Sequence, residues 1–574
     1  RTERMSLTSA INIGRSGLAA NQAAVEVAGN NLSNAATPGY TRQTAVIRAA
    51  TDVQVKPGLF IGTGARLDSI IRNVDAALMS RMRSAMADHA GSNVRQDVLS
   101  QIEAIHNELS ETGLGSRLTE FFNSWSELAN NTAEPSLRQL VIEQGDSLAE
   151  FVQATRGDLA ASRNQLDDRI NGTVDQANAI LDQIAELNAK IGVAEAGLGG
   201  ANAMRDQRDQ LVNDLAKMLD IATVEQSNGS LDVFLNGIPL VTAGENRGLA
   251  VDFATPAGGE ELGVRLRLGD DGTYLTATSG SIGQMIESRT NDVLPALEAL
   301  DNFATALIRE VNRVHSQGQG AELFLSVTGG VQVADAAAPL TRSDAELDFV
   351  PGHGTFALHV TQQSTGTRTT TQINLDADGI GGPDMSLNDL AAAIDAVVNV
   401  SASVTVDGRL QIDADSPDFA FSFSDDASGV LTSLGVNTFF SGHDATDIGV
   451  SQTLANKPAL LATTQNHVAG GNGTALAIAG LAEQPLDGLG GQTLGQMWSA
   501  HVEDYAVRAE CATLDAQSDQ TILESLQAQR EGVSGVSVDE EAINLMAFQR
   551  AYQGSARFLN VVNELMDTLL GLVR

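Results

Sequence analysis

The sequence predicts an elongated, multi-domain subunit of the α+β class, mainly α. It should have coiled-coil helices at both termini, a bundle of long helices with β-hairpins, and an inserted, mostly-β outer domain. Three observations predict this class. Apolar or small residues recur at alternating steps of four and three at both ends and in long interior segments. Asn-Gly and Asp-Gly pairs between alternating apolar residues mark hairpins. Residues 321–455 are rich in Thr, Ser, Asp and Gly.

A narrow apolar stripe runs along the predicted first helix. This N-terminal stripe consists of Leu7, Ile11, Gly14, Leu18, Val25, Ala28 and Leu32, with Asn21 as its one polar member. Such a stripe needs a partner helix to cover it. The helix is expected to end at Pro38-Gly39, a pair that fits the two central positions of a type II turn.

Three asparagines, Asn30, Asn31 and Asn34, stand just before this turn. Asparagine is a poor helix former, because its amide competes for backbone groups. Two interpretations stay open: a frayed helix end, or a ladder of amides that hydrogen-bond to neighbouring chains. Under the second interpretation the three residues belong to an assembly interface.

A matching stripe runs along the predicted last helix. This C-terminal stripe consists of Leu545, Phe548, Tyr552, Ser555, Leu559, Val562, Met566 and Leu569. A chain with such helices at both ends either pairs them with each other or offers them to neighbouring chains. Both options indicate assembly rather than catalysis. The expected assembly interface consists of Leu7, Ile11, Leu18, Val25, Asn30, Asn31, Leu32, Asn34, Leu545, Phe548, Tyr552, Leu559, Val562, Met566 and Leu569.

Helices and short strands alternate between the two termini. The expected elements are strands and turns over 43–70, helices over 71–110, 114–130 and 202–219, hairpins over 221–280, and helices over 281–315 and 491–530. Pro135 opens a further helix of about 60 residues, on the order of 90 Å long. Pro295 predicts a kink, and Gly318 predicts a helix stop.

The chain is long enough for roughly three or four domains. We expect a terminal coiled-coil domain from residues 5–42 and 538–574. Residues 43–320 and 456–537 form a helical domain with hairpins. Residues 321–455 form the inserted β domain, with a helix over 386–397 behind a Ser-Leu-Asn-Asp cap.

Charge and cysteine content exclude several classes of function. The formal net charge of −37 leaves no basic stripe for nucleic acid and no polybasic membrane anchor. No apolar run reaches the ~18 to 20 residues of a membrane span. The N-terminus lacks a cleaved secretory signal, and Met5 is the expected initiator after four extra residues, Arg1 to Arg4. Cys511, the single cysteine, is expected to be an inert structural thiol.

No pattern in the sequence supports catalysis, a cofactor or a metal. Residues 376–381 resemble the start of a calcium loop, but position twelve is Leu387 where a glutamate is required. We interpret the segment as a turn with solvated carboxylates, and interpret Asp413/Asp415 and Asp425/Asp426 as solvated faces. His353 and His359 are six residues apart, without metal-ligand spacing. No nucleophile elbow or phosphate-binding loop occurs.

Several segments together resemble the bacterial flagellar axial proteins. The stretch 27–40 is similar to the N-terminal motif shared by rod, hook and hook-associated proteins, and residues 541–569 are similar to their C-terminal motif. Within this family, 205–211 and 311–318 resemble the hook-associated members, since rod and hook proteins continue mainly into β-structure. Residues 385–442 are similar to a module inserted in several flagellar proteins.

The resemblance implies a structural subunit of the ring between hook and filament. It implies unfolded export through the flagellar type III apparatus and an extracellular location, with terminal helices that fold on joining the tube wall. The implied partners are further copies of the chain, the hook protein, the next hook-associated junction protein, and a cytosolic export chaperone on the C-terminal helix; nucleic acid and membrane are not among them. The alternatives are a main filament or hook subunit, or a hydrolase or adhesin carried by residues 321–455.

Overall fold

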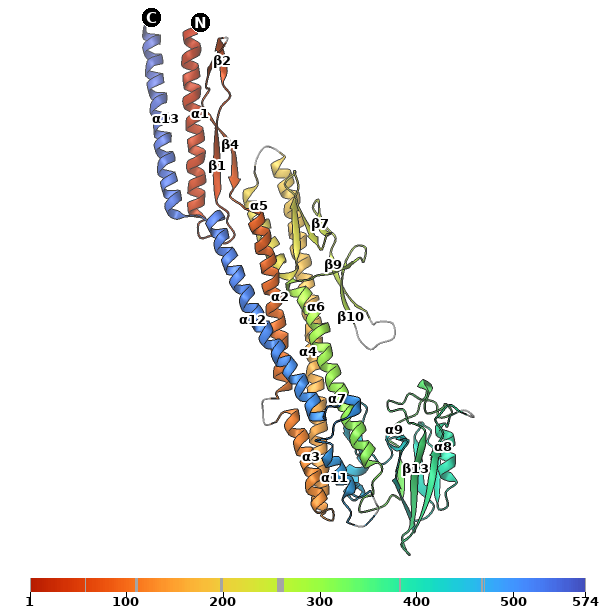
Figure 1. Cartoon of the computed structure of the whole chain (residues 1–574). Helices are drawn as coiled ribbons and strands as arrows, with labels where there is room; N and C mark the ends of the chain where they lie inside the picture. Colours follow the sequence, from red (N-terminus) through yellow and green to blue (C-terminus); the bar gives the residue numbers. More distant parts are fainter. Residues whose placement is uncertain are drawn as a thin grey trace. The chain divides into compact units, whose positions relative to one another are not determined.

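The computed structural model describes residues 2–56, 58–108, 112–196, 200–254, 263–380, 384–465, 468 and 470–572. The predicted mainly helical α+β class is confirmed (Figure 1). The Cα atoms cluster into two compact units. Unit 1 holds residues 1–97, 166–290 and 511–574, and unit 2 holds residues 98–165 and 291–510. These borders differ from our three expected domains, whose division stays a prediction.

The helices account for most of the ordered backbone. They are α1 (Thr2–Ser33), α2 (Ala76–His106), α3 (Leu114–Asn130), α4 (Pro135–Glu195), α5 (Asn202–Met218), α6 (Gly280–Ser288), α7 (Leu294–His315), α8 (Leu387–Asp395), α9 (Val430–Ser433), α10 (Gln452–Asn456), α11 (Gly473–Gly480), α12 (Leu494–Ser534) and α13 (Val538–Leu572). Pro135 opens the 61-residue α4, as expected for a residue that lacks an N–H. Among the described residues, no helix is both long and apolar enough to cross a membrane.

The strands of unit 1 form antiparallel ribbons and small sheets. The pairs are β1 (Gln43–Ala49) with β4 (Ala65–Arg72), β2 (Val53–Lys56) with β3 (Leu59–Ile61), a sheet of β5 (Ile221–Glu225), β6 (Leu231–Leu235), β7 (Ile238–Thr242) and β8 (Glu245–Asn246), and a sheet of β9 (Leu249–Ala254), β10 (Gly263–Leu268) and β11 (Tyr274–Leu275). Asn236 and Gly237 join β6 to β7 with φ of 47° and 81°. Positive φ at both positions is the type I′ geometry, so this predicted hairpin turn is confirmed.

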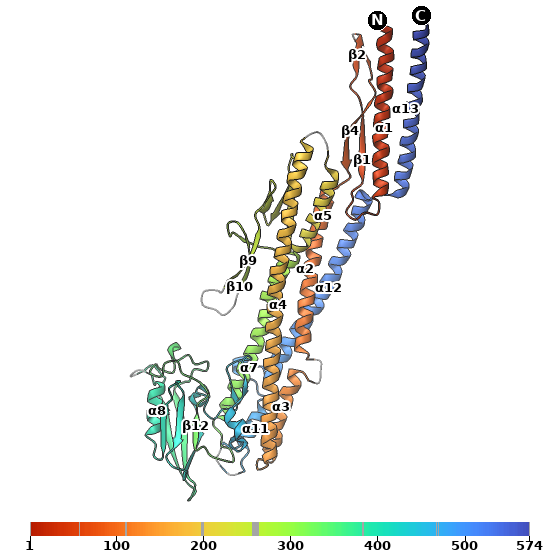
Figure 2. The same ribbon diagram turned by 180° about the vertical axis from the view of Figure 1, so that it is seen from behind.

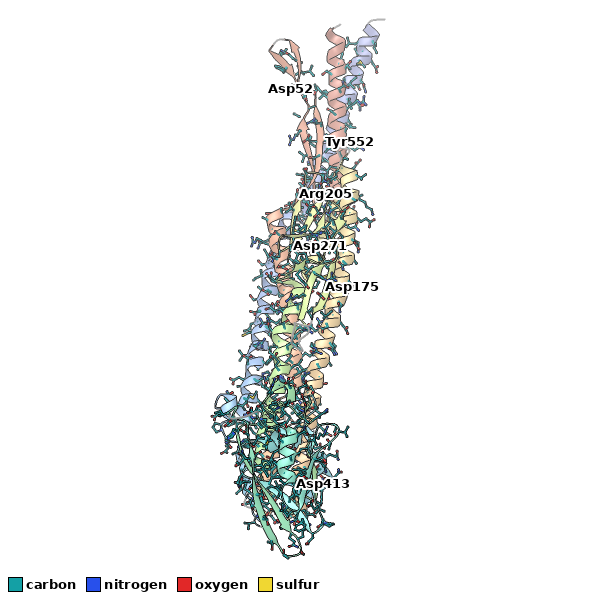
Figure 3. The ribbon with its side chains drawn as sticks, turned by 90° about the vertical axis from the view of Figure 1, so that its right-hand side faces the viewer. Asp52, Asp175, Arg205, Asp271, Asp413 and Tyr552 are labelled. Atoms are coloured by element: carbon teal, nitrogen blue, oxygen red, sulfur yellow. The ribbon has the colours of Figure 1, made fainter. Side chains whose placement is uncertain are left out.

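The segment 205–211 anchors α5 to its neighbours in unit 1. The Arg208 side chain is 1 % exposed and donates from Nη1 to Asn188 Oδ1 at 2.8 Å and to the carbonyl of Gly229 at 2.7 Å. Asp206 accepts from Arg72 Nη1 at 2.8 Å. Arg205, labelled in Figure 3, pairs with Glu195 at 2.7 Å. This segment therefore joins α5 to β4, to α4 and to the β5–β6 turn.

Replacing Arg208 by Met should lower the free energy of unfolding of unit 1 by about 3 kcal/mol. The thioether fills part of the space but leaves Asn188 Oδ1 and the Gly229 carbonyl short of a buried donor. Urea unfolding followed by hydrogen exchange of the β5–β6 hairpin measures the change. Lys217→Met, at an exposed residue of the same helix, is the control. Equal stability of both variants would contradict the anchoring role.

The strands of unit 2 form two three-stranded sheets. They are β14 (Thr367–Leu375), β13 (Gly354–Gln362) and β17 (Phe419–Ser424) in one, and β12 (Ser326–Thr328), β16 (Leu410–Ala414) and β15 (Val400–Val404) in the other. A short ribbon pairs β18 (Phe440–Ser441) with β19 (Gly449–Val450). Phe356, Phe421 and Phe423 are completely buried. Ser386 caps α8 in a reciprocal capping box with Asp389, which confirms the predicted start.

The segment 311–318 anchors a loop of unit 2 to the end of α7. Asn312 accepts the backbone N–H groups of Phe439 and Phe440, both at 2.9 Å, and donates to the Phe440 carbonyl at 2.9 Å. The ring of His315 lies between the Asn437 carbonyl, 2.8 Å from Nδ1, and the Ala462 N–H, 3.0 Å from Nε2. One nitrogen of His315 therefore donates and the other accepts, as in a neutral imidazole.

The predicted kink at Pro295 is wrong in its position. The irregularity is a π-helical turn over Arg289–Val293, and Pro295 stands in the first turn of α7. Proline lacks the N–H that would bond to the carbonyl four residues earlier. That carbonyl, of Asn291, accepts from Arg508 Nη2 at 2.8 Å, and the Asp292 carbonyl accepts from the Tyr505 hydroxyl at 2.5 Å. Side chains of α12 thus donate hydrogen bonds to two carbonyl groups of the π-helical turn.

Gly318 lies just beyond the end of α7, but it does not have the left-handed conformation of a glycine that stops a helix. The helix ends at His315, and Gly318 has no positive φ. A Cβ at Gly318 would lie 2.5 Å from Thr474 Oγ1 and 2.7 Å from Ala462 Cβ. Glycine is needed here because the backbone comes close to α11 and to the segment before it.

Gly318→Ala should therefore destabilise unit 2 by about 1–3 kcal/mol through overpacking. The matched control is Gly157→Ala, an exposed position within α4 where nothing lies within 4 Å of the added Cβ. There alanine should raise stability by up to about 1 kcal/mol, because it is the better helix former. Thermal unfolding of both variants gives the comparison, and equal effects would refute the close approach at Gly318.

The buried His106 and the partly buried His501 lie in an aromatic cluster of unit 2. The ring of His106 packs edge-on against Trp498, His501 and Tyr505, with centroid separations of 5.3, 5.1 and 5.6 Å. His106 is 1 % exposed, and neither of its ring nitrogens has a hydrogen-bond partner among the described residues. Burial, with a smaller contribution from His501, lowers the pKa of His106 to about 4. Burial also lowers the pKa of His501 to about 4.

Candidate assembly interface

The two terminal helices of unit 1 lie side by side and run antiparallel, with both chain ends at the same end of the pair (Figures 1 and 2). A Cβ on Gly14 would lie 2.7 Å from the Leu559 side chain, and one on Gly17 would lie 3.2 Å from Ser555 Oγ. Both views place α1 between α13 and the β1–β4 ribbon, and α1 contacts both. The structure therefore pairs the two terminal helices with each other.

The C-terminal stripe faces α1 along most of α13. Val562 is 4 % exposed, and Leu545, Phe548, Tyr552, Leu559 and Met566 are half-buried. Figure 3 labels Tyr552 on this helix. Leu569 differs, with 39 % of its side chain exposed near the end of the helix. The predicted 4-3 pattern thus marks the contact between α13 and α1.

Small residues, not the leucines, are the most buried positions of α1. Ala20, Ala24 and Ala28 are 1 to 2 % exposed. The larger members Leu7, Ile11, Leu18 and Val25 are half-buried, and Leu32 is exposed at 38 %. A run of alanines four residues apart lets two backbones approach closely. The sequence prediction weighted large apolar residues and therefore did not include these alanines, apart from Ala28.

The amide of Asn31 makes four hydrogen bonds, all within the chain. Its Nδ2 donates to the Gln43 carbonyl at 2.8 Å and to Glu541 Oε2 at 3.1 Å. Its Oδ1 accepts from the Gln43 N–H at 3.0 Å and from the Tyr40 hydroxyl at 2.8 Å. This fills the capacity of an amide. Asn31 therefore joins α1 to β1 and to the start of α13, an arrangement that neither of our interpretations included.

The other two asparagines lie at the exposed end of α1. Asn30 donates to the Tyr40 hydroxyl at 3.3 Å, and Asn34 donates to Asn30 Oδ1 at 2.9 Å. The turn that follows has the predicted geometry, since Gly39 has φ of 81° and the Tyr40 N–H bonds to the Thr37 carbonyl at 3.2 Å. Whether these asparagines contact neighbouring chains stays a prediction.

Arg42 and Glu541 form an ion pair that links the segment after α1 to the start of α13. The sequence did not predict this contact. Arg42 Nε donates to Glu541 Oε1 at 2.8 Å, Arg42 Nη1 lies 2.9 Å from Glu540, and the Arg42 N–H bonds to the Ser534 carbonyl at 2.9 Å. Burial, then the charges of Asp206 and Glu541, raises the pKa of Tyr40 to about 12, so this phenol stays a donor. The one signal in the sequence was an acidic residue, Glu541, at the start of the C-terminal motif, and its burial to 3 % exposure is visible only in the structure.

A second apolar stripe lies beside the first on α13, at the edge of the contact with α1, where a Cβ on Gly14 would lie 3.1 Å from Phe558 Cδ1. This outer stripe consists of Ile543, Ala547, Gly554, Phe558, Val561 and Leu565, again at steps of four, three or seven. Its large side chains are exposed at 62 % for Ile543, 43 % for Phe558, 54 % for Val561 and 53 % for Leu565. Exposed apolar side chains that align along one helix are a candidate contact surface.

The predicted solvated carboxylates include one error. Asp426 is 9 % exposed and caps α9, because its Oδ1 accepts the Gly429 N–H at 2.8 Å and its Oδ2 accepts the Leu431 N–H at 2.9 Å. Its neighbour Asp425 accepts from the Ser424 hydroxyl at 2.7 Å. Carboxylates close to a helix N-terminus satisfy free N–H groups and the helix dipole, which the acidic composition concealed.

His353 and Cys511 have surroundings in the structure that the sequence did not predict. His353 comes within 3.5 Å of Asp376 and 3.9 Å of Asp378 at the surface, so the loop gains a histidine that its sequence spacing did not suggest. Gly381 of that loop lies outside the described residues. Cys511 is exposed on α12, which differs from a thiol enclosed in the structure. The helical period alone could not say which side of α12 faces a neighbour.

Three family models match successive parts of the chain. The model of the flagella basal body rod protein matches residues 11–41, and that of the rod FlgEFG protein C-terminal matches residues 528–572. Between them, the model of the flagellar hook-associated protein FlgK helical domain matches residues 99–324. The two rod-protein matches cover α1 from residue 11 onward and all of α13, the helices that carry the paired stripes.

Relatives that match along nearly their whole length share the same name. Flagellar hook-associated protein 1 of Escherichia coli K12 is 25 % identical, with 99 % of this chain and all of the relative covered. The protein of the same name from Salmonella typhimurium is 26 % identical over 99 % of this chain and all of its own, and that of Bacillus subtilis is 26 % identical over 97 % and 96 %.

A solved structure, of the flagellar hook junction protein FlgK from Burkholderia pseudomallei, is also similar. It is 16 % identical, covers 79 % of this chain and 100 % of its own, and has a TM-score of 0.49. The central family match and the full-length relatives both name flagellar hook-associated proteins, and the two rod-protein matches lie toward the two ends of the chain. The chain therefore belongs to the family of flagellar hook-associated protein 1, structural proteins of the flagellum that lie outside the cell and assemble with other flagellar components.

Proposed function

We propose that the chain is a subunit of the ring between hook and filament and that it assembles through α1 and α13. The single observation that carries the proposal is the second apolar stripe of α13. The C-terminal stripe faces α1 of the same chain, while Ile543, Val561 and Leu565 of the outer stripe are more than half exposed. A helix with two apolar stripes is suited to bind one helix of its own chain and a helix of a neighbour.

The energetics of the outer stripe favour association. Burying one large apolar side chain contributes roughly 1.5 to 3 kcal/mol. Ile543, Phe558, Val561 and Leu565 together offer several times that amount, repeated in each subunit of a ring. Association also costs translational and rotational freedom, which a closed ring with two interfaces per subunit offsets better than a single pair does.

The exposed tip of the β2–β3 hairpin provides a second candidate contact. Val53, Leu59, Phe60 and Ile61 are 46 to 60 % exposed. They belong to unit 1, as do α1 and α13. We propose that this hairpin meets a neighbouring subunit together with the outer stripe, and that Asn30 and Asn34 lie at the edge of the same contact.

The proposed partners are further copies of the chain, the hook protein, the next hook-associated junction protein, and a cytosolic export chaperone. The chaperone would cover the outer stripe of α13 and so keep it from associating before export. We propose export through the flagellar type III apparatus without a cleaved signal, and folding of the two terminal helices on assembly. We also propose a purely structural role, without catalysis.

Adding purified protein to hook-bearing cells that lack their own copy tests the proposed place in the flagellum. Filaments should grow on the bare hooks once flagellin and the other junction protein are present. Growth that is equally good without the added chain would contradict the junction role. Electron micrographs of the deletion strain separate the alternatives, because loss of a main hook subunit would remove the hooks as well.

A further inference from the structure

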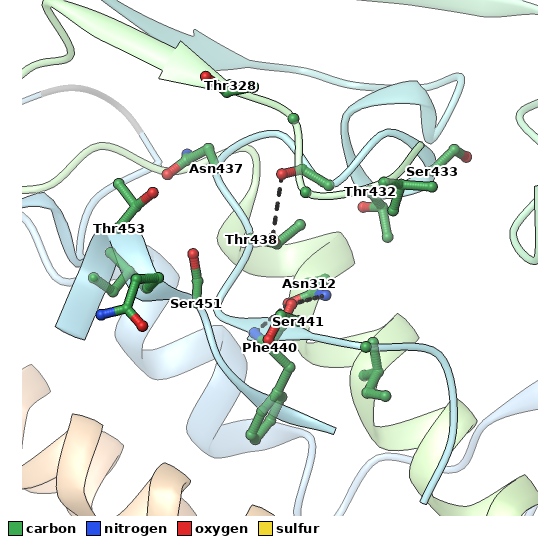
Figure 4. Close-up of a pocket in the computed structure, with 18 of the residues that line it drawn as sticks. Asn312, Thr328, Thr432, Ser433, Asn437, Thr438, Phe440, Ser441, Ser451 and Thr453 are labelled. Carbon is green, nitrogen blue, oxygen red and sulfur yellow. Dashed lines mark hydrogen bonds between the residues drawn. The ribbon is translucent and has the colours of Figure 1, made fainter. Parts of the chain in front are cut away.

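A cavity of about 350 Å³ lies in unit 2 beside α7 (Figure 4). Its wall comes from the segment after β12, the loop after α9, and the segment from β18 to α10. This volume is within the range of small-molecule sites in proteins. Neither the assembly helices nor the proposed junction role uses this cavity.

The hydrogen-bond donors in the wall are already engaged within the protein. Ser433 donates to the Gly429 carbonyl at 2.9 Å, Thr438 to the Gly435 carbonyl at 3.4 Å, and Ser441 to the Gly449 carbonyl at 3.2 Å. Thr328 donates to Gln411 Oε1. A hydroxyl that donates keeps its lone pairs, so each of these side chains remains an acceptor.

Asn437 adds a buried acceptor to this wall. Its side chain is 6 % exposed, and its Nδ2 donates to the carbonyls of His315, Ser316 and Gly318 at 3.3, 2.9 and 3.0 Å. These three contacts fix the orientation of the amide. Oδ1 then faces away from them, and it is buried without a hydrogen-bond partner among the described residues. An acceptor left in this state costs roughly 1–3 kcal/mol.

Two hydroxyls of the wall carry no hydrogen bond within the described part of the chain. Ser451 and Thr453 come just before and within α10, and Figure 4 shows their side chains on the same side of the cavity as Asn437. Together with the engaged hydroxyls they make a wall that has more acceptors than free donors, because only Ser451 and Thr453 among these hydroxyls still have an O–H to donate. A complementary ligand must therefore bring several donors of its own.

The charged residues of the wall are paired. Asp348 lies 3.3 Å from His443 Nε2, and Arg409 Nε lies 3.0 Å from Asp407. No charge of the wall is left to attract an ion, which favours a neutral ligand. Phe324, Val327 and Val331 supply apolar surface in the same cavity. A ligand with hydroxyl donors and a carbon face suits both kinds of surface.

We propose that this cavity binds a neutral polyhydroxylated ligand, namely one sugar unit of a glycan. The sugar hydroxyls donate to Ser451, Thr453 and the other acceptors, and the C–H face of the ring packs on the apolar residues. The binding is non-covalent and independent of assembly through α1 and α13.

Saturation-transfer NMR of the whole chain with the methyl glycosides of glucose, galactose and N-acetylglucosamine tests the proposal. At least one glycoside should bind, and Ser451→Ala/Thr453→Val should weaken that binding by about tenfold, as expected for two lost hydrogen bonds. Ser401→Ala/Thr369→Val removes two exposed hydroxyls from β15 and β14 and should leave the affinity unchanged.

Three results would overturn the proposal. The first is no binding of any of the three glycosides. The second is binding that the Ser451/Thr453 variant does not weaken, because the ligand would then sit elsewhere. The third is binding of methylammonium without binding of a glycoside, since the acceptors would then serve a cation. Circular dichroism of both variants establishes that each one is folded before titration.

Discussion

At pH 5 we expect unit 2 to be less stable than at pH 7 by about 4 kcal/mol or more. The pKa values of His106, His501 and the fully buried His315 are each lowered to about 4, in every case chiefly by burial. An unfolded histidine has a pKa near 6.5, so the unfolded chain binds more protons below that pH. The stability that depends on these neutral histidines is fully present above pH 6.5 and is lost as the pH falls toward 4. At pH 5, each of the three histidines lowers the free energy of unfolding by roughly 2 kcal/mol.

Tryptophan fluorescence during urea unfolding measures this change, since both tryptophans, Trp125 and Trp498, belong to unit 2. The ring of His106 has no hydrogen bond to lose, so His106→Phe should be nearly neutral at pH 7 and recover about 2 kcal/mol at pH 5. His443→Gln is the control. Burial is the largest single effect on this half-exposed residue and lowers its pKa, but the neighbouring aspartates together outweigh it, so that the pKa of His443 is raised. If His106→Phe keeps the pH dependence of the unchanged protein, the buried histidines do not cause it.

Val561→Asp/Leu565→Asp should abolish assembly and leave the free subunit folded. Both side chains are more than half exposed, so the free chain should change by no more than about 0.5 kcal/mol. In a packed contact the two new carboxylates would be buried without partners, at a cost of several kcal/mol each. Purified variant added to hook-bearing cells should therefore restore no filaments.

The matched control places the same charges elsewhere on α13. Gln549→Asp/Gln553→Asp also introduces two carboxylates four residues apart, at exposed positions between the two stripes. It should restore filament growth to the level of the unchanged protein. Urea unfolding of both variants shows whether the free subunit is intact. Filament growth with Val561→Asp/Leu565→Asp would mean that the outer stripe is not an assembly surface.

Features set by local sequence were predicted well. Pro135 at the start of α4, the Ser386 cap of α8, and the Asn236-Gly237 turn follow from rules that involve a few adjacent residues. The C-terminal stripe was also predicted, because a period of 3.5 residues is visible over many turns. These signals do not depend on what the rest of the chain does.

Features set by distant contacts were not predicted. The four bonds of Asn31 depend on Gln43 and on Glu541, which lies 510 positions away, and no spacing rule connects them. The requirement for glycine at Gly318 comes from Thr474 on α11. The outer stripe and the C-terminal stripe alternate along the same segment of sequence. Only the exposed fractions of their side chains in the structure distinguish one stripe from the other.

Site-specific photo-crosslinking in assembled flagella tests the central claim most directly. A benzoylphenylalanine at Val561 probes the outer stripe, and one at Leu559 probes the side that faces α1. The account predicts a product with a second polypeptide from position 561 and a product within the chain from position 559. Cross-linking from position 561 only within its own chain, in flagella whose filaments have grown, would contradict it.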